Sequence, residues 1–263
     1  MSNGFEVLAE GIGKAIETVP EVYEDGLKPV AQESGKTIAL IPRAINAALV
    51  PLRQWIAVKE YNIAETEKLL SKKLEHVGED KIVTPEPYVA IPALQAISYS
   101  MNSEELRNLY ANLLAKSMIS DSKDSVHPSF VEIIKQMSPN DAKVFQIIMK
   151  TESRPLITLS KQLKSGGSIP IQYHCSWVTE LSLKQFSTSI DSLIRLGLIE
   201  IPFGDYYSND NIYHIVKQNP LFKTLENAIS AVLANGERIK YDNEYIKITD
   251  LSSLFYNVCI LNP

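Results

Sequence analysis

The sequence predicts a mainly α protein, with a helical N-terminal domain over residues 1–137 and a C-terminal winged-helix-like α+β domain over residues 138–263. Three observations support this prediction. A long amphipathic pattern starts at Pro51, a strong helix-start signal stands at Ser138, and a helix, strand, loop and strand follow one another over residues 182–216. The chain has 263 residues, 45% hydrophobic and 22% charged, which is enough for two packed domains.

The N-terminal domain is predicted to consist of amphipathic helices. Residues 1–25 place apolar side chains on one helical face, and residues 28–49 continue with a helix of small residues that prolines divide. Pro51 then begins the clearest helix, which runs to about Val77. Its apolar stripe consists of Leu52, Ile56, Ile63, Leu70, Leu74 and Val77. We expect this helix to be the structural spine of the domain.

The second part of this domain is predicted to start with a stiff connection. Residues 79–92 include three prolines within eight residues, so we expect an extended segment there and helix only after Pro92. Asn102 and Glu105 have the spacing of a capping pair for the next helix. A further short helix is expected to begin at Pro128.

The C-terminal domain is predicted to begin at Ser138. Ser138 is followed by proline at the first helical position and by Asp141 near the positive helix end. Residues 156–159 are a short strand candidate, and residues 165–168 are an irregular Gly-rich stretch. Ser182 and Gln185 then cap a helix that ends at Gly197. Its predicted inward side chains are Phe186, Ile190, Leu193 and Ile194.

A hairpin is predicted directly after that helix. Residues 198–201 are expected to form a strand, residues 202–211 a turn-rich loop, and residues 212–216 the returning strand. This order is typical of a winged helix-turn-helix. A last helix over residues 221–233 and short strands around residues 239–248 complete the chain.

Composition and charge disfavour several classes of protein. The formal net charge is -5, with 14 Lys+Arg against 19 Asp+Glu in residues 1–137 and 12 against 12 in the rest, so neither half attracts phosphate backbones in bulk. The two cysteines make no disulfide framework, and the chain start lacks the pattern of a secretory signal. The four histidines include no pair at i, i+4 spacing. We expect a cytoplasmic protein without metal or cofactor.

Residues 37–58 are long enough to span a bilayer, but their charge argues against it. Eight aliphatic side chains gain about 2–5 kcal/mol, whereas Arg43 and Arg53 together cost up to about 7 kcal/mol near the centre. The wider segment 26–57 is predicted to dock on a partner or on the inner-membrane surface, or alternatively to pack on the spine helix. The candidate contact residues are Ile41, Arg43, Leu49, Leu52, Arg53 and Trp55.

The winged-helix order suggests DNA binding, but the charges oppose it. The loop 202–211 holds Asp205 and Asp210 and no Lys or Arg, so it would repel a phosphate backbone. We therefore expect a protein partner or self-association, with nucleic acid as the disfavoured alternative. The candidate contact residues, for DNA or protein, are Lys184, Gln185, Thr188, Arg195, Tyr206 and Tyr207.

Catalysis lacks its usual sequence marks. The chain contains no GxxxxGK[ST], GxGxxG, GxSxG or HExxH motif. The neighbours His174 and Cys175 suggest a nucleophile with its base, but adjacent residues rarely face each other, and no third orienting group is indicated. We predict that the protein is not an enzyme and has no small-molecule substrate.

Three runs of sequence resemble the bacterial abortive infection alpha family. They are PRAINAALVPLRQWIAVKEYNIAETEKLL, IVTPEPYVAIPALQAISYSMNSEELRNLYANLLAKSM and VHPSFVEIIKQMSPNDA. The likeness extends roughly over residues 25–215, and residues 85–142 are its most specific part. The resemblance implies defence against bacteriophage, in which an infected cell is halted or killed before the phage matures. It transfers no catalytic motif.

The sequence patterns and the family resemblance together predict a non-enzymatic anti-phage protein that acts through protein or membrane-surface contacts. In this hypothesis the helical domain is the effector or partner-binding part, and the winged-helix-like domain senses or assembles. The alternative function is a winged-helix transcriptional regulator that binds DNA.

Overall fold

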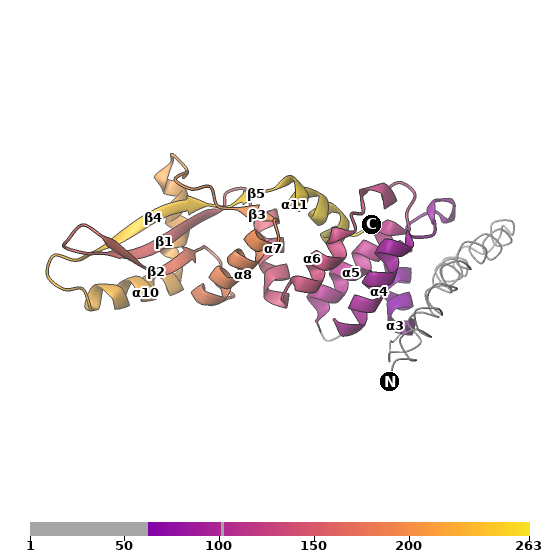
Figure 1. Cartoon of the computed structure of the whole chain (residues 1–263), viewed down its shortest axis with the longest axis horizontal. Helices are drawn as coiled ribbons and strands as arrows, with labels where there is room; N and C mark the ends of the chain where they lie inside the picture. The colour runs from indigo at the N-terminus through magenta and orange to yellow at the C-terminus, as the bar shows by residue number, and fades with distance from the viewer. Residues whose placement is uncertain (1–62, 101–102) are drawn as a thin grey trace, which may run out of the picture. The chain divides into compact units, whose positions relative to one another are not determined.

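The computed structural model describes residues 63–100 and 103–263, which form two compact units (Figure 1). The first unit contains the described residues up to Glu132 together with Leu261–Pro263, and the second is Ile133–Ile260. The helices predicted before residue 51 and the first part of the spine helix lie outside the described residues. The domain boundary predicted after residue 137 stays a prediction.

The first unit is helical. Its helices are α3 (Ile63–Leu74), α4 (Pro87–Tyr99), α5 (Glu104–Ser117) and the start of α6 (Ser129–Gln136), with short 3-10 turns at Glu79–Lys81 and Lys123–Ser125. Both α3 and α4 pack against α5. Buried apolar side chains form the core between them, including Leu70, Leu74, Leu94, Ile97, Leu113 and Phe130. The end of the spine helix is therefore three residues earlier than predicted.

Helix α4 begins earlier than the sequence suggested. Residues 82–86 lie outside helices, as expected, but Glu79–Lys81 form a 3-10 turn, and α4 starts at Pro87 and continues through Pro92. Proline suits the first turn because the N–H that it lacks has no partner there. The density of prolines thus marked the start of a helix, and the prediction that helix begins only after Pro92 is wrong.

Helix α5 has a different cap from the predicted one. Ser103, not Asn102, is the N-cap residue, and its Oγ accepts a hydrogen bond from the backbone N–H of Leu106. Ser103 also donates from Oγ to the carboxylate of Glu105 at 3.1 Å. The N-cap is therefore one residue later than predicted, while Glu105 contacts it as expected.

Two helices of the second unit have their N-caps at the predicted residues. In α7 (Pro139–Lys150), Ser138 and Asp141 form a reciprocal capping box, and in α8 (Leu183–Arg195), Ser182 and Gln185 do the same. Gly197 follows α8 with a φ of 71°, which ends the helix. The inward prediction holds for Phe186, Ile190 and Leu193, but Ile194 is 39% exposed.

The second unit also contains a three-stranded antiparallel sheet that is longer than predicted; two of its strands precede α8 in sequence and the third follows it. Its order is β2 (Ser168–Cys175), β1 (Pro155–Gln162) and β4 (Arg238–Tyr245). Strand β1 covers the predicted residues 156–159, and β4 lies in the region where strands were predicted. Strand β2 was not predicted, although Ile169, Ile171 and Tyr173 alternate along it; these apolar side chains are exposed at the sheet edge.

The predicted hairpin is wrong. Residues 212–216 are helical, in a 3-10 turn (Asp210–Tyr213) and α9 (His214–Gln218). Tyr213 and Val216 are buried three residues apart while the residues between them are exposed, which is the spacing of a helix. Strand β3 (Ile199–Glu200) pairs instead with β5 (Lys247–Ile248).

The remaining elements complete one core. Helix α10 (Pro220–Ala231), which was predicted, lies along the sheet in Figure 1, and Phe222 and Ile229 join Ile157 and Leu159 in a buried cluster. The chain ends in α11 (Asp250–Phe255) and a π-helical turn (Tyr256–Ile260). The protein is thus mainly helical with a small antiparallel sheet. The winged-helix architecture stays a prediction.

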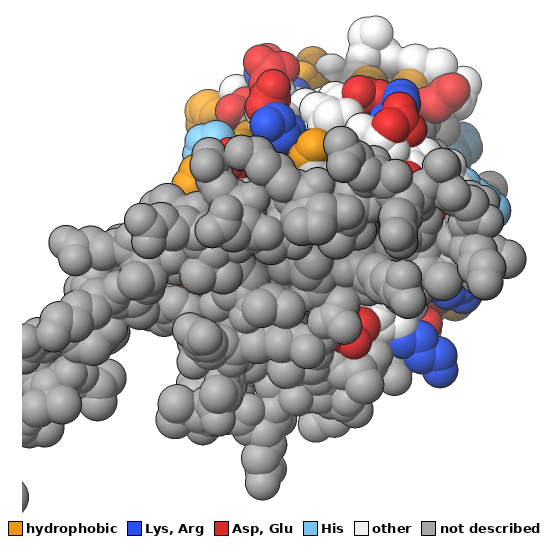
Figure 2. Space-filling model, turned by 90° about the vertical axis from the view of Figure 1, so that its right-hand side faces the viewer, with side chains coloured by type: hydrophobic (Ala, Val, Ile, Leu, Met, Phe, Trp, Pro, Cys, Tyr) orange, Lys and Arg blue, Asp and Glu red, His pale blue; other side chains and the backbone are white. Residues whose placement is uncertain are grey.

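The described residues test one part of the prediction about membranes, namely whether a helix crosses the bilayer. Among the described residues, no helix is both long and apolar enough to cross a bilayer. The described side chains visible in Figure 2 include acidic and basic groups close to one another, as solvated surfaces ordinarily do. Residues 37–58, which are predicted not to span a membrane, lie outside the described residues.

Candidate functional site

A groove of about 830 Å³ lies in the second unit, over one face of the sheet. Its floor comes from β1, β2 and β4, and its walls come from the end of α8 and the loop after β3. Ligand pockets in proteins are commonly clefts of about 300–1,000 Å³. The groove is therefore the candidate functional site among the described residues.

The strand register explains the polar floor. Thr158 is paired with Asp242, and Ser160 with Lys240, so their side chains share one face of the sheet. The hydroxyl of Thr158 donates to Glu244 Oε2 at 3.1 Å, and Lys240 Nζ lies 2.7 Å from Asp242 Oδ1. The opposite face carries Ile157 and Leu159 into the core. The alternation of β1 thus separates groove from core.

His174 has an unusual backbone at the centre of this face. Tyr173 and His174 together oppose Thr158, because the register shifts there, and His174 has a φ of 55°. Among the described residues, no other residue except glycine has a positive φ. A bulge with this conformation redirects a side chain, and such strained positions often serve a function.

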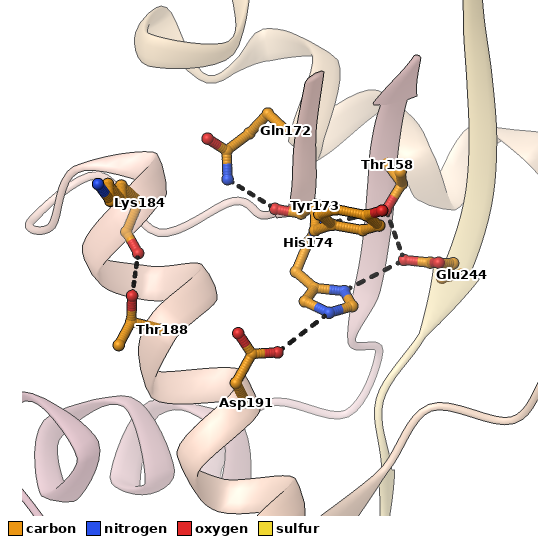
Figure 3. Close-up of polar contacts among 8 residues, drawn as sticks. All are labelled: Thr158, Gln172, Tyr173, His174, Lys184, Thr188, Asp191 and Glu244. Atoms are coloured by element: carbon orange, nitrogen blue, oxygen red, sulfur yellow. Dashed lines mark hydrogen bonds and ion pairs between the residues drawn. The ribbon is translucent and has the colours of Figure 1, made fainter. Parts of the chain in front are cut away.

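The redirected imidazole lies between two carboxylates (Figure 3). His174 Nδ1 is 3.3 Å from Glu244 Oε2 of β4, and Nε2 is 3.7 Å from Asp191 Oδ1 of α8. The backbone N–H of His174 donates to the hydroxyl of Thr158 at 3.4 Å. His174 therefore connects the sheet to α8.

Cys175 does not share the site with its neighbour. Its side chain is fully buried in the core cluster, on the face of the sheet away from the groove. Burial raises the pKa of its thiol to about 12. At neutral pH the thiol is protonated and inaccessible, so the pair His174 and Cys175 lacks the geometry of a nucleophile with its base.

Exposed apolar side chains line the groove, both on its walls and on β2. Phe203 is fully exposed beside Gly204, which has a φ of 79°, and Tyr206 and Tyr173 are 63% and 52% exposed. Ile194 also lines the groove, which explains its outward direction at the end of α8. Exposed aromatic side chains gathered round a groove are typical of contact sites.

The groove is acidic. The carboxylates of Asp205, Asp242 and Glu244 line it, against the single lysine Lys240. In the part of the chain that the structure describes, no group of three or more His, Cys, Asp and Glu is arranged to hold a metal ion. The two ring nitrogens of His174 point to different carboxylates and do not converge on one point.

Of the predicted contact residues that the structure describes, Tyr206 lines the groove and the others do not. Lys184, Gln185 and Thr188 are exposed on α8. The Gln185 side chain is part of the helix cap, and the Thr188 hydroxyl donates to the Lys184 carbonyl. Arg195 donates to Gln136 Oε1 at 2.7 Å. Their role as contacts stays a prediction.

Tyr207 makes contacts that stabilise the fold of the second unit. Its hydroxyl accepts a hydrogen bond from the backbone N–H of Arg154, and its ring packs against Tyr213 and Tyr245. The N-terminal candidates Ile41 to Trp55 lie outside the described residues.

Three residues of the groove, Thr158, Asp242 and Glu244, were not predicted from the sequence. The alternation Lys240, Asp242, Glu244 within a strand was the available signal, because it places three charges on one face.

Comparison with known proteins supplies a family. The abortive infection alpha model matches residues 58–259, which is most of the chain. No curated protein and no solved structure matches the chain. The resemblance seen in the sequence is therefore confirmed, and the chain belongs to the abortive infection alpha family.

Proposed function

We propose that this chain is a non-enzymatic phage-defence protein that acts by binding a protein partner in the sheet groove. The family supports the context of abortive infection. The observation that carries the binding role is the fully exposed Phe203 on the groove wall, beside Tyr206. We also propose that the protein acts in the cytoplasm and that residues 26–57 contact the membrane surface peripherally.

The apolar wall favours a protein contact. Burying a large aromatic side chain contributes about 1.5–3 kcal/mol, so leaving Phe203 in water forgoes that stabilisation in the free protein. Gly204 lets the loop turn and hold Phe203 outward. A partner that covers Phe203 and Tyr206 recovers the lost burial energy on binding.

The polar centre supports a binding role over a catalytic one. Both ring nitrogens of His174 face carboxylates, and the hydroxyls of Thr158 and Ser160 donate to Glu244 and Asp242. No hydroxyl or thiol among these residues is held against the imidazole as a nucleophile would be. The network instead fixes the floor of the groove.

The proposal predicts that the groove wall is needed for protection. The double variant Phe203→Ala/Tyr206→Ala, expressed in a phage-sensitive host, is expected to protect at least about tenfold less well than the parent protein. Loss of one aromatic contact worth roughly 1.4 kcal/mol weakens binding of the partner about tenfold. Efficiency of plating measures the protection. Both side chains are exposed, so the fold is expected to persist.

The matched control is Ile215→Ala/Val232→Ala. These residues are 51% and 77% exposed in the same unit and do not line the groove. Protection is expected to remain within about twofold of the parent protein. Full protection by the folded groove variant, or equal loss in both double variants, would contradict the proposal.

A further inference from the structure

We infer that the groove binds an extended protein segment that carries Lys or Arg side chains. This inference rests on the proposed function and adds the chemical class of the partner. Its basis is the combination of an acidic floor and aromatic walls in one groove.

The charge of the groove is unbalanced toward carboxylates. Asp205 on the loop and Asp242 and Glu244 on β4 face the single lysine of the groove lining, Lys240. Lys240 and Asp242 are both well exposed, at 44% and 38%, so their ion pair contributes only about 0–1 kcal/mol and a competing cation exchanges with it readily. An incoming Lys or Arg therefore finds acceptors, while a phosphate backbone meets repulsion.

The spacing of the carboxylates suits an extended chain. Asp242 and Glu244 are two residues apart on one strand, on the same face, so their Cα atoms are separated by about 6.6 Å. An extended peptide repeats its own side chains on one face at this same distance. Cations at alternate positions of the peptide thus match the two carboxylates in register.

The aromatic walls add a second contact for the same side chains. Tyr173, Phe203 and Tyr206 offer exposed rings beside the acidic floor. Guanidinium and ammonium groups bind over such rings, and the alkyl stems of Arg and Lys pack on apolar surface. A neutral or acidic segment would gain the apolar part of this contact and lose the charged part.

The test uses the full chain and a short fluorescein-labelled peptide in which Arg alternates with Ser. The matched control peptide replaces each Arg by citrulline, which keeps the shape and removes the charge. Fluorescence anisotropy is expected to give an affinity at least about tenfold higher for the arginine peptide, decreasing as salt rises.

Two variants locate the binding. Asp205 is exposed on the loop, and Asp205→Lys is expected to weaken binding of the arginine peptide roughly tenfold. Glu152 is also exposed but does not line the groove, and Glu152→Lys makes the same change of charge with an expected effect within about twofold. Equal effects of the two variants would indicate attraction to net charge alone and overturn the inference.

The remaining outcomes are distinct from those for the proposed function. Absence of arginine-peptide binding, or equal binding of the citrulline peptide, overturns the cationic class. If Phe203→Ala/Tyr206→Ala still abolishes protection, the groove remains a contact site for another kind of segment. If that variant protects fully, the groove itself is the wrong site.

Discussion

At the scale of single residues, adjacent side chains in β2 have opposite environments. His174 stands in a left-handed conformation that costs roughly 1–2 kcal/mol for a residue with a Cβ, and contacts with Thr158, Glu244 and Asp191 offset this cost. Cys175, the next residue, is sealed in the core. One bulge therefore gives the groove its imidazole and the core its thiol.

The buried thiol predicts a loss of stability at high pH. The pKa of Cys175 is about 12 in the folded protein against an ordinary value of 9.0. Its contribution to the free energy of unfolding is therefore fully present below pH 9. As pH rises from about 9 toward 12, only the unfolded thiol ionises. The free energy of unfolding is then expected to fall by up to about 1.4 kcal/mol per pH unit from this group.

Denaturant titrations at a series of pH values measure this effect. Cys175→Ala is expected to show a shallower decline above pH 9 than the parent protein, although its stability at pH 7 is lower. Burial also raises the pKa of Cys259, so that thiol contributes in the same direction in both proteins. Identical slopes for the parent and the variant would show that Cys175 ionises freely in the folded state.

At the scale of elements, a cap joins α10 to the segment after β2. The Asn219 side chain is buried, and its Nδ2 donates to the carbonyls of Ser176 and Val178 at 2.9 Å each. Its Oδ1 accepts from the backbone N–H of Leu221, which caps the helix. One amide thus satisfies three backbone groups, and the loop and the helix are stabilised together.

We expect Asn219→Asp to destabilise the protein by about 2–4 kcal/mol. The substitution keeps the cap acceptor, but it removes both donors and places a carboxylate against two carbonyl oxygens. Urea denaturation measures the loss. Asn209→Asp is the control, because Asn209 is an exposed N-cap whose side chain only accepts a bond, and aspartate caps equally well. A similar loss in both variants would contradict this account.

At the scale of the whole molecule, the net charge of the chain and the charge of the groove are both negative. The chain carries -5 overall, and the groove holds three carboxylates against one lysine. The exposed Lys184 on α8 is the strongest remaining argument for the alternative DNA-binding function, since Arg195 is hydrogen bonded to Gln136. This charge distribution favours cationic partners over polynucleotides.

We therefore expect duplex DNA to bind more weakly than about 10⁻⁴ M at physiological salt, the upper limit typical of non-specific binding. Fluorescence titration of a labelled duplex with the full chain measures the affinity, and Lys184→Glu is expected to leave it unchanged. Tight binding that decreases steeply with salt and at least about tenfold on Lys184→Glu would favour the transcriptional regulator.

The sequence by itself determined the features that depend on neighbouring residues. The N-caps at Ser138 and Ser182 and the helix end at Gly197 were predicted correctly, because each depends on hydrogen bonds or dihedral angles within a few residues. The family was also readable from the sequence. The groove itself was not predicted, although three of its residues, His174, Asp205 and Tyr206, were singled out in the sequence for other reasons.

Only the tertiary structure decided the pairing of distant segments. Strand β2 exposes its apolar side chains at an edge, and residues 212–216 form a helix that buries Tyr213 and Val216 against the sheet. The site combines Thr158, His174 and Glu244 through a strand register and a bulge. Such pairings depend on contacts far apart in sequence, and a short apolar run is compatible with strand and helix until its partner is known.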